Sequence, residues 1–392
     1  MTYLVVSDYS LQYLGGAQVA MLRQAEALAS QGSRVVVIAP GGDATSMPAG
    51  VEYMAPPPAR AIPGAGLPVF TNNEQLRSWF RKRYAEMQPT AVLTHSEFGL
   101  AVAAVQVARE TGIVTLHTVH TFFWRSHFVA DVTAPIAQWL YRRKTGLKLG
   151  HERLSRHPLA NKLRHMTLAM CRQVDVVVSP SAHQGARLKE CDLARVEVIS
   201  NVTAVVPHTG VTDAPADRLV LIWAARFAPE KRLSVAVRAM ALVRERLTER
   251  GHDANVVELQ VAGGSAQPDE HVTWLGKIEP HEVRSRIAAS NAVVITSVGF
   301  DNQPMVALEA FAAGRPVIVS DPVLATEFGE AAIQARDAEA HGLAETILEL
   351  SSNRDALARA SAAAHKRAAL SSPEGHVKRL RAVVESVKAE RA

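Results

Sequence analysis

Short apolar runs alternate with longer amphipathic stretches along most of the chain. The first run, Tyr3–Ser7 (YLVVS), is followed by Gly15-Gly16 and by a stretch rich in Ala, Leu and Gln at Ala17–Gln31. Apolar runs without polar alternation are typical of parallel strands buried on both faces, and the stretches between them are long enough for helices. The pattern predicts a doubly wound sheet. Its further strands are expected at Arg34–Ala39, Ala91–Thr94, Val114–Thr118, Val174–Ser179 and Val196–Ile199, and its further helices at 72–87 and 99–111.

A break at 203–217 separates this half from a second alternation. The segment holds two prolines and a glycine and has little periodicity, which is typical of a linker. We therefore expect an α/β protein of two Rossmann-like domains, 1–206 and 207–373, that face a central cleft. A final helix at 374–391 is expected to pack on the first domain. The second domain has predicted strands at Leu219–Ala224, Val257–Val261, Val272–Leu275, Ala292–Thr296 and Pro316–Ser320, and predicted helices at 234–249, 281–290 and 304–313.

Composition narrows the class of protein. The 392 residues are 48% hydrophobic and 21% charged, as in ordinary globular proteins. No apolar run reaches the ~18 residues that a membrane-spanning helix needs, and no basic region precedes the first apolar run as in a signal peptide. The two cysteines, Cys171 and Cys191, lack the spacing of a metal site. These features predict a cytoplasmic protein.

Positive charge is concentrated in 142–165, which holds eight Lys and Arg residues and one acid, Glu152. Such a cluster can bind nucleic acid, anionic lipid or a phosphorylated substrate, and it can also be a solvated helical face. Trp139 and Tyr141 stand beside it, and Phe122-Phe123-Trp124-Arg125 lies upstream. Trp, Tyr, Lys and Arg together suit an interface with anionic lipid.

Ligands of open α/β sheets bind in loops after the strands, and three such loops hold candidate residues. Gly15-Gly16 opens a helix whose first amides can approach a phosphate, although a glycine pair also suits a plain tight turn. Arg226 and Lys231 follow a strand and suit the two phosphates of a diphosphate. Two solvated surface charges are the alternative.

The third loop combines Asp301 with Glu309, which lies eight residues further on inside an apolar helix. Pro304 suits the first turn of that helix, where a missing N–H costs little. A carboxylate within an apolar helix needs a specific partner. The hydroxyl groups of a ligand would serve, and so would a structural arginine such as Arg226.

These motifs together resemble those of retaining glycosyltransferases with the GT-B fold, above all glycosyltransferase family 4. The resemblance rests on Gly15-Gly16, on Arg226 with Lys231, on Asp301 with Glu309, and on the Ala-Gly-x-Pro-Val of 313–317. Ser179-Pro-Ser181, 198–201 and Gly263-Gly264 stand in the expected order. The resemblance spans nearly the whole chain and is strongest from 219 to 320.

The resemblance implies roles for individual residues. Arg226 and Lys231 would hold the donor diphosphate, and Glu309 would bind the donor ribose. Asp301 stands where the family usually has Glu, whose carboxylate meets hydroxyl groups of the transferred sugar; the shorter arm leaves the identity of that sugar open. The donor-binding positions are Gly15, Gly16, Arg226, Lys231, Gly263, Ile278, Asp301, Asn302, Gln303, Met305, Val306 and Glu309.

His120, in Thr118-Val-His-Thr, is similar to the family's histidine near the transferred sugar, with His117 as the alternative, although a lone histidine after a strand is often structural. The resemblance further implies a nucleotide-sugar donor, front-face retention and no metal ion or other cofactor. It favours a lipid or lipid-linked acceptor, with peripheral contact to the inner membrane face through 142–165. A soluble acceptor, a UDP-sugar 2-epimerase of the same fold and a non-enzymatic nucleic-acid binder are the alternatives; nothing else in the chain indicates a nucleic-acid module.

Overall fold

The computed structural model describes residues 1–12, 15–61, 68–120, 134–155, 158–203, 217–265, 269 and 271–391. The chain divides into two compact units. Unit 1 comprises Met1–Val202 and Pro373–Ala392, and unit 2 comprises Thr203–Ser372. The sequence placed these boundaries at 206/207 and 373/374. The aromatic segment Phe122–Arg125 lies outside the described residues.

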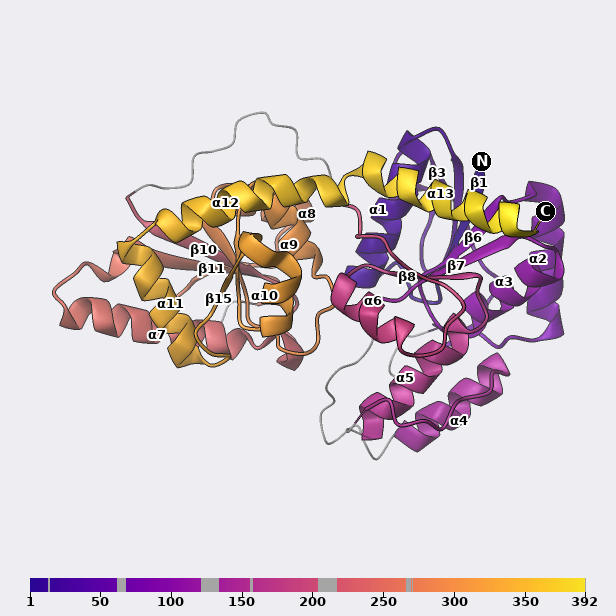
Figure 1. Ribbon diagram of the computed structural model, residues 1–392, viewed down its shortest axis with the longest axis horizontal. Coiled ribbons are helices and arrows are strands. Elements are labelled where there is room, and N and C mark those ends of the chain that lie inside the picture. Colours follow the sequence, from indigo (N-terminus) through magenta and orange to yellow (C-terminus); the bar gives the residue numbers. More distant parts are fainter. Residues whose placement is uncertain are drawn as a thin grey trace. The chain divides into compact units, whose positions relative to one another are not determined.

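Unit 1 is built on a parallel sheet of strand order β3-β2-β1-β6-β7-β8-β9 (Figure 1). Its strands are β1 (Thr2–Val6), β2 (Arg34–Ile38), β3 (Val51–Met54), β6 (Ala91–Thr94), β7 (Val114–Thr118), β8 (Val176–Ser179) and β9 (Val196–Val198), and β4 (Arg60–Ala61) pairs with β5 (Pro68–Val69). Its helices are α1 (Gly16–Ser30), α2 (Glu74–Met87), α3 (Gly99–Glu110), α4 (Ala134–Thr145), α5 (Pro158–Cys171), α6 (Ala182–Lys189) and α13 (Pro373–Arg391).

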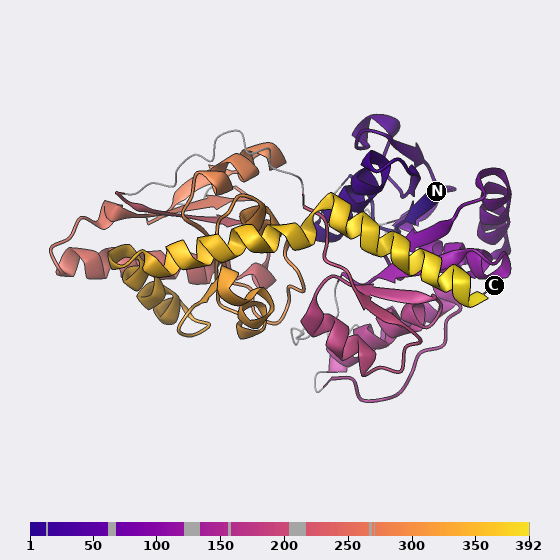
Figure 2. The same ribbon diagram turned by 45° about the horizontal axis from the view of Figure 1, so that its top comes forward.

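Helices cover both faces of this sheet, which explains its continuous apolar strands. Along β1, Tyr3 and Val5 pack in one buried cluster with α1 and α13, whereas Leu4 and Val6 pack in another with α2 and α3. The C-terminal helix α13 runs along unit 1 (Figure 2), and Arg381 in this helix donates to the backbone carbonyl of Gln31 at the end of α1. The chain therefore returns to its first domain after completing unit 2.

Unit 2 repeats the architecture, with a parallel sheet of order β12-β11-β10-β13-β14-β15. Trp223 packs with α7 and α11 on one face, and Ile222 packs with α9 and α10 on the other. The strands are β10 (Leu219–Ala224), β11 (Val257–Ala262), β12 (Thr273–Gly276), β13 (Ala292–Ile295), β14 (Val317–Val319) and β15 (Ala332–Gln334). The helices are α7 (Leu233–Glu249), α8 (Pro280–Ala288), α9 (Met305–Ala312), α10 (Pro322–Phe328), α11 (Ala340–Ser352) and α12 (Asp355–Ala368).

The predicted doubly wound sheets are confirmed, and most strand bounds differ by one or two residues from those expected. The sequence analysis did not predict β3, β15, α10 or the longer helix α4. The first three elements are short and lie next to loops, where local periodicity is weak. Among the described residues, no helix is long and apolar enough to cross a membrane.

Candidate active site

The donor-binding residues expected in unit 2 follow four strands that are neighbours in the sheet. Arg226 follows β10, Gly263 follows β11, Ile278 follows β12 and Asp301 follows β13, and the spatial order of these strands is β12-β11-β10-β13. Because the strands are parallel, the residues that follow them all emerge at the carboxyl edge of one sheet. Residues up to 75 positions apart in sequence are thus gathered along one edge.

Lys231 and Asp301 form an ion pair at this edge. The Lys231 Nζ lies 2.5 Å from Asp301 Oδ1, and the two side chains are only 19% and 10% exposed. Ser297 donates its hydroxyl to the other carboxylate oxygen of Asp301. Lys231 Nζ also lies 5.4 Å from the centre of the Phe300 ring, close enough for a cation–π contact. The structure therefore joins two residues that the sequence analysis had assigned to diphosphate and sugar.

The backbone around Lys231 is held by a buried hydroxyl. Thr296, at the end of β13, donates to the Lys231 carbonyl at 2.7 Å. The same hydroxyl accepts a hydrogen bond from the indole Nε1 of Trp223 at 3.0 Å. Trp223 and Thr296 are both at most 2% exposed, so the hydrogen bond between these two side chains is shielded from water. They tie the loop after β10 to the end of β13.

Gly263 and Gly264 are required by close packing against the loop that carries Arg226. Gly263 has φ +126°, and a Cβ there would lie 1.9 Å from the Ala225 carbonyl oxygen. A Cβ at Gly264 would lie 2.5 Å from the Phe227 ring. The glycine pair at this position therefore has a structural explanation in the packing of the β10 and β11 loops.

Asp301 leads into α9, which carries Glu309. Asn302 is buried, Gln303, Met305, Val306 and Glu309 are partly buried, and Pro304 is the N-cap residue of α9. The preceding turn is held by Asp321, whose carboxylate accepts a hydrogen bond from the Gly299 amide at 2.6 Å. Glu309 thus lies partly buried on an otherwise apolar helix.

Arg226 differs from Lys231 in its surroundings. Its side chain is 69% exposed, and its ion pair with Glu230 is long, at 3.8 Å. The long side chain can therefore reorient at small energetic cost. A cation held in an ion pair and a largely exposed cation thus stand five residues apart in this loop.

In unit 1, the glycines at the start of α1 have no packing explanation. A Cβ at Gly16 would meet nothing within 4 Å, and at Gly15 it would meet only the flexible Gln18 side chain, at 3.1 Å. Neither residue has a positive φ. The turn itself would accept alanine at Gly16 without any contact, in contrast to Gly263.

His120 follows β7 in unit 1, and it is partly buried beside a second histidine that the sequence analysis did not predict. Its Nε2 lies 2.7 Å from Nδ1 of His95, which follows β6, and the two rings stack with centres 5.0 Å apart. Burial lowers the pKa of His120 to about 4 and that of His95 well below its ordinary value. Both rings are therefore neutral at pH 7.

Two carboxyl groups complete this edge of unit 1, and the sequence analysis had not singled out either. Asp8, which follows β1, caps α3 by accepting hydrogen bonds from the Leu100 and Ala101 amides at 2.7 and 3.1 Å. Burial and the nearby Asp8 carboxylate raise the pKa of Glu97 to about 7. Glu97 lies 3.9 Å from Nε2 of His117, a nitrogen for which no described residue lies within hydrogen-bonding distance.

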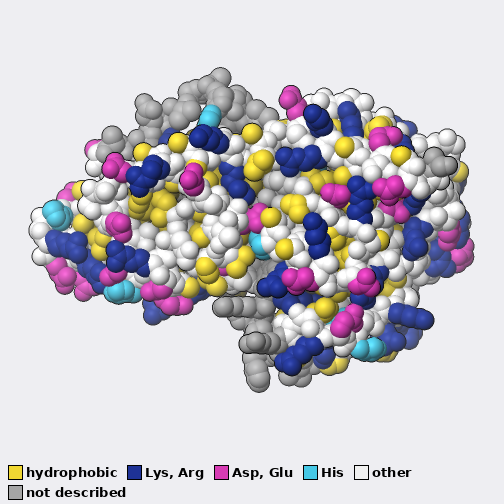
Figure 3. Space-filling model, in the orientation of Figure 1, with side chains coloured by type: hydrophobic (Ala, Val, Ile, Leu, Met, Phe, Trp, Pro, Cys, Tyr) yellow, Lys and Arg dark blue, Asp and Glu magenta, His cyan; other side chains and the backbone are white. Residues whose placement is uncertain are grey.

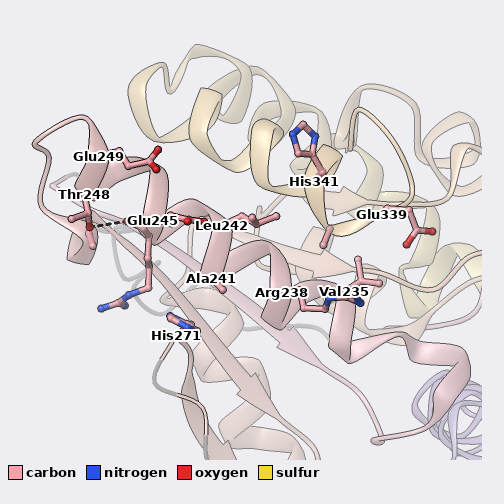
Figure 4. Close-up of a pocket in the computed structure, with 13 residues that line it drawn as sticks. Val235, Arg238, Ala241, Leu242, Glu245, Thr248, Glu249, His271, Glu339 and His341 are labelled. Atoms are coloured by element: carbon pink, nitrogen blue, oxygen red, sulfur yellow. Dashed lines mark hydrogen bonds between the residues drawn. The ribbon is translucent and has the colours of Figure 1, made fainter.

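A surface groove lies elsewhere, along the outer side of α7 (Figure 4). Leu242 and Glu245 of α7 line it together with His271, Glu339 and His341. It contains none of the residues expected to bind the donor. Within the described parts of the chain, no three His, Cys, Asp or Glu residues are grouped as metal ligands.

Comparisons with known proteins find a family-model match in each of the two units. Residues 14–203 match the family model of Glycosyltransferase Family 4, and residues 218–353 match that of Glycosyl transferases group 1. None of the curated proteins matches the chain significantly.

Solved structures are similar over almost the whole chain. HepE from Anabaena, in complex with UDP and glucose, is 15% identical, with a TM-score of 0.66 over 98% of this chain and 100% of its own. A TarM variant from S. aureus, in complex with fondaparinux, alpha-GlcNAc-glycerol and UDP, is 10% identical, with a TM-score of 0.66 and coverage of 98% and 100%. A putative UDP-N-acetylglucosamine 2-epimerase from Listeria monocytogenes is 15% identical, with a TM-score of 0.60 and coverage of 99% and 97%.

The first family model covers residues 14–203 and the second covers the shorter range 218–353, and they fall on the two Rossmann-like sheets. At 10–15% identity the solved structures show the fold, and the family models show the class of enzyme. The chain is a glycosyltransferase with the GT-B fold.

Proposed function

We propose that the enzyme transfers a hexose from a nucleotide-diphosphate sugar to an acceptor hydroxyl, with retention of anomeric configuration and without a metal ion. The observation that carries the proposal is the gathering of Arg226, Lys231, Asp301 and Glu309 at and beside the carboxyl edge of the unit 2 sheet. Two cations and two carboxylates match the diphosphate and the hydroxyl groups of such a donor. HepE and TarM, which share the fold, were solved with UDP.

In this proposal the protein positions the donor and stabilises its leaving group. Lys231 has three N–H donors, so it can keep its hydrogen bond to Asp301 and still donate to a phosphate oxygen. The bond between the sugar C1 and the phosphate oxygen breaks while the acceptor oxygen bonds to C1 on the same face. The leaving phosphate takes the acceptor proton, and Arg226 and Lys231 stabilise the negative charge.

Donor binding can be tested by thermal unfolding with UDP, GDP, ADP and their sugar conjugates. A ligand at ~100 times its Kd stabilises the folded protein by about 2.7 kcal/mol, which shifts Tm by several degrees. We expect one nucleotide series to give this shift, and Glu309→Ala and Lys231→Ala to lose it. Lys366→Ala, at an exposed position on α12, is the control and should keep it. No shift with any nucleotide, or an unchanged shift in both variants, would contradict the donor site.

We further propose that the acceptor is a lipid or lipid-linked molecule reached from an anionic membrane surface. The support is α4, where Ile136, Trp139 and Leu140 are 62%, 58% and 42% exposed. Arg143 lies over the Trp139 ring at 5.6 Å, and Arg142 is exposed beside it. An exposed apolar face bordered by arginines suits the boundary between lipid headgroups and acyl chains.

Two basic residues of 142–165 are held by contacts within unit 1. Arg164 is 7% exposed and donates to the Leu154 carbonyl, and Lys144 donates to the Thr71 hydroxyl at 3.0 Å. Basic and acidic side chains are interspersed on the face shown in Figure 3, without the continuous basic band that favours nucleic acid. The proposed membrane contact therefore rests on α4 and its exposed arginines, rather than on all of 142–165.

Sedimentation with vesicles tests this contact. Each arginine near an anionic surface contributes ~1 kcal/mol, so Arg142→Gln with Arg143→Gln should weaken binding to phosphatidylglycerol vesicles about 30-fold. The charge-matched control, Arg359→Gln with Lys366→Gln on α12, should bind like wild type. Equal binding by both double variants, or equal binding to neutral phosphatidylcholine, would contradict the proposal and favour a soluble acceptor.

A UDP-sugar 2-epimerase is the second candidate, because a putative epimerase shares the fold at a TM-score of 0.60. An epimerase converts a UDP-sugar without any acceptor, whereas a transferase leaves the sugar of its donor unchanged. Analysis of a UDP-sugar incubated with the enzyme alone distinguishes the two: a new UDP-sugar epimer would support the second candidate.

A further inference from the structure

A chain of hydrogen bonds runs from His120 through the interior of unit 1 to a main-chain carbonyl. Nε2 of His120 contacts Nδ1 of His95 at 2.7 Å, and Nε2 of His95 contacts Oε1 of Gln24 at 2.9 Å. Nε2 of Gln24 contacts Nε2 of His376 at 2.9 Å, and Nδ1 of His376 contacts the Ser200 carbonyl oxygen at 2.8 Å. Four side chains, from the loops after β6 and β7 and from α1 and α13, are thus joined. We call them the histidine relay.

The Ser200 carbonyl sets the direction of the relay. A carbonyl oxygen can only accept, so Nδ1 of His376 must carry a hydrogen. Burial lowers the pKa of His376 to about 4, so at pH 7 the ring is neutral and has no second N–H. Its Nε2 must then accept, and the amide nitrogen of Gln24 is the donor that faces it. The orientation of the Gln24 amide follows from this requirement.

The remaining steps follow in the same way. With its amide nitrogen turned to His376, Gln24 presents its oxygen to His95, whose Nε2 must be the donor. His95 is 3% exposed and neutral, so its Nδ1 has a lone pair and accepts a hydrogen bond from Nε2 of His120. Because His120 is also neutral, its Nδ1 has no hydrogen. Every bond of the relay has one allowed direction.

We propose that Gln24, His95 and His376 are positioning residues that hold His120 as the neutral Nε2–H tautomer, so that its Nδ1 accepts a hydrogen bond from a sugar hydroxyl of the substrate. The part concerning the substrate rests on the proposed function. The relay makes Nδ1 of His120 selective for a group that can donate a hydrogen bond. A hydroxyl group satisfies this condition, whereas fluorine or hydrogen at the same carbon does not.

This role gives α13 a function beyond covering the sheet. The apolar side chains Val377, Leu380 and Val384 would suffice for packing. His376, in contrast, is 3% exposed and places a polar ring within the interior, where both its nitrogens have partners. A purely structural role requires only that these polar atoms are satisfied, and it makes no demand on the tautomer of His120.

The first test measures tautomers in the wild-type protein. Two-dimensional NMR of protein labelled with ¹⁵N at the histidine ring nitrogens distinguishes a nitrogen that carries hydrogen from one that does not. The spectra of His120→Gln, His95→Gln and His376→Gln assign the signals. At pH 7.5 we expect hydrogen on Nδ1 of His376 and on Nε2 of both His95 and His120. Any other pattern, including a charged ring, would overturn the proposal, and this result needs no substrate.

The second test reverses the direction of the hydrogen bonds from Gln24 to His120. Gln24→Lys places a residue that can only donate against His95, which should move the hydrogen of His95 to Nδ1 and that of His120 to Nδ1 as well. Gln24→Met has a side chain of similar length that donates no hydrogen bond to His95. His120 should therefore not change to the Nδ1–H tautomer in this variant. Thr94→Val removes the neighbouring hydrogen bond to His117 at 2.9 Å and is the control that leaves the relay intact. A folded Gln24→Lys protein with unchanged His120 would contradict the proposal.

The substrate part is tested with donors in which one sugar hydroxyl at a time is replaced by fluorine. In wild type, one of these analogues should lose at least tenfold in kcat/KM, and Gln24→Lys should reduce that loss. Equal discrimination by both proteins would overturn this part. If no donor supports transfer at all, the proposed function fails while the tautomer measurement still decides whether the relay exists.

Discussion

The carboxyl edges of the two sheets share one topology and carry different chemistry. In unit 1 the edge is lined by His95, Glu97 and His120, whose pKa shifts all favour the uncharged form. In unit 2 the corresponding edge carries the Lys231–Asp301 ion pair and the exposed Arg226. One edge is therefore suited to neutral hydrogen bonds and the other to an anionic ligand.

The two edges differ in the strength and the kind of hydrogen bond that each can offer. Neutral hydrogen bonds contribute about 0.5–1.5 kcal/mol each and discriminate by the direction of donors and acceptors. Charge-assisted hydrogen bonds are about twice as strong and suit a phosphate that gains charge in the transition state. We expect the unit 1 edge to contribute selectivity and the unit 2 edge to contribute most of the rate.

The largest effect expected is that of Lys231→Ala. Removing one group that stabilises developing negative charge costs about 10²–10³-fold in kcat. His120→Ala removes a single neutral hydrogen bond and should cost roughly tenfold in kcat/KM. Steady-state kinetics with the donor found by thermal unfolding measures both, with Lys366→Ala as a control at wild-type rate. Equal losses for Lys231→Ala and His120→Ala would mean that the two edges do not differ in their contribution to the rate.

The glycine pairs provide the next contrast. Gly263→Ala places a Cβ 1.9 Å from a carbonyl oxygen at φ +126°, and we expect a loss of about 1–3 kcal/mol in the free energy of unfolding. Gly16→Ala meets nothing within 4 Å and should change stability by less than about 0.5 kcal/mol. Urea denaturation measures both. Similar losses would mean that the two pairs do not differ in their structural role.

Lowering the pH should reduce the stability of unit 1. The pKa values of His120 and His376 are lowered to about 4 and that of His117 to about 3, so these groups stabilise the fold above pH 6.5 and lose this contribution as the pH falls towards 4. Glu97, whose pKa is raised to about 7, acts in the opposite direction. Because three histidines act against this single carboxyl group, we expect the free energy of unfolding to fall by about 1 kcal/mol from pH 7.5 to 6.

Hydrogen exchange of backbone amides at the two pH values locates this loss. Amides of β1, β6 and β7 should exchange faster at pH 6, after correction for the intrinsic pH dependence, while those of β10 and β13 should change less. A greater loss in unit 2 would contradict the assignment of the buried histidines as the source.

The smallest effect expected is that of Arg226→Ala on stability. The side chain is 69% exposed and its ion pair is 3.8 Å long, so the free energy of unfolding should change by less than about 0.5 kcal/mol. Transfer activity should nevertheless fall, because the cation is expected to act on bound diphosphate. Urea denaturation and kinetics on the same protein measure the two effects, and a large loss of stability would indicate a structural role instead.

The two Rossmann-like sheets could be predicted from local pattern because strands buried on both faces leave continuous apolar runs such as Arg34–Ala39 and Leu219–Ala224. The candidate donor residues could be named because they stand directly after those runs. The short elements β3, β15 and α10 could not be predicted, since each has too few residues for a periodic signal.

The fold class and the positions of Arg226, Lys231, Asp301 and Glu309 after their strands follow from local sequence, because these depend on residues close together along the chain. The tertiary structure was needed to show that Lys231 pairs with Asp301, 70 residues away, and that Gly263 but not Gly16 is required by packing. It alone joined Gln24 to His376, 352 residues apart. Hydrogen bonds between distant segments depend on how helices and strands pack, and no local pattern records that packing.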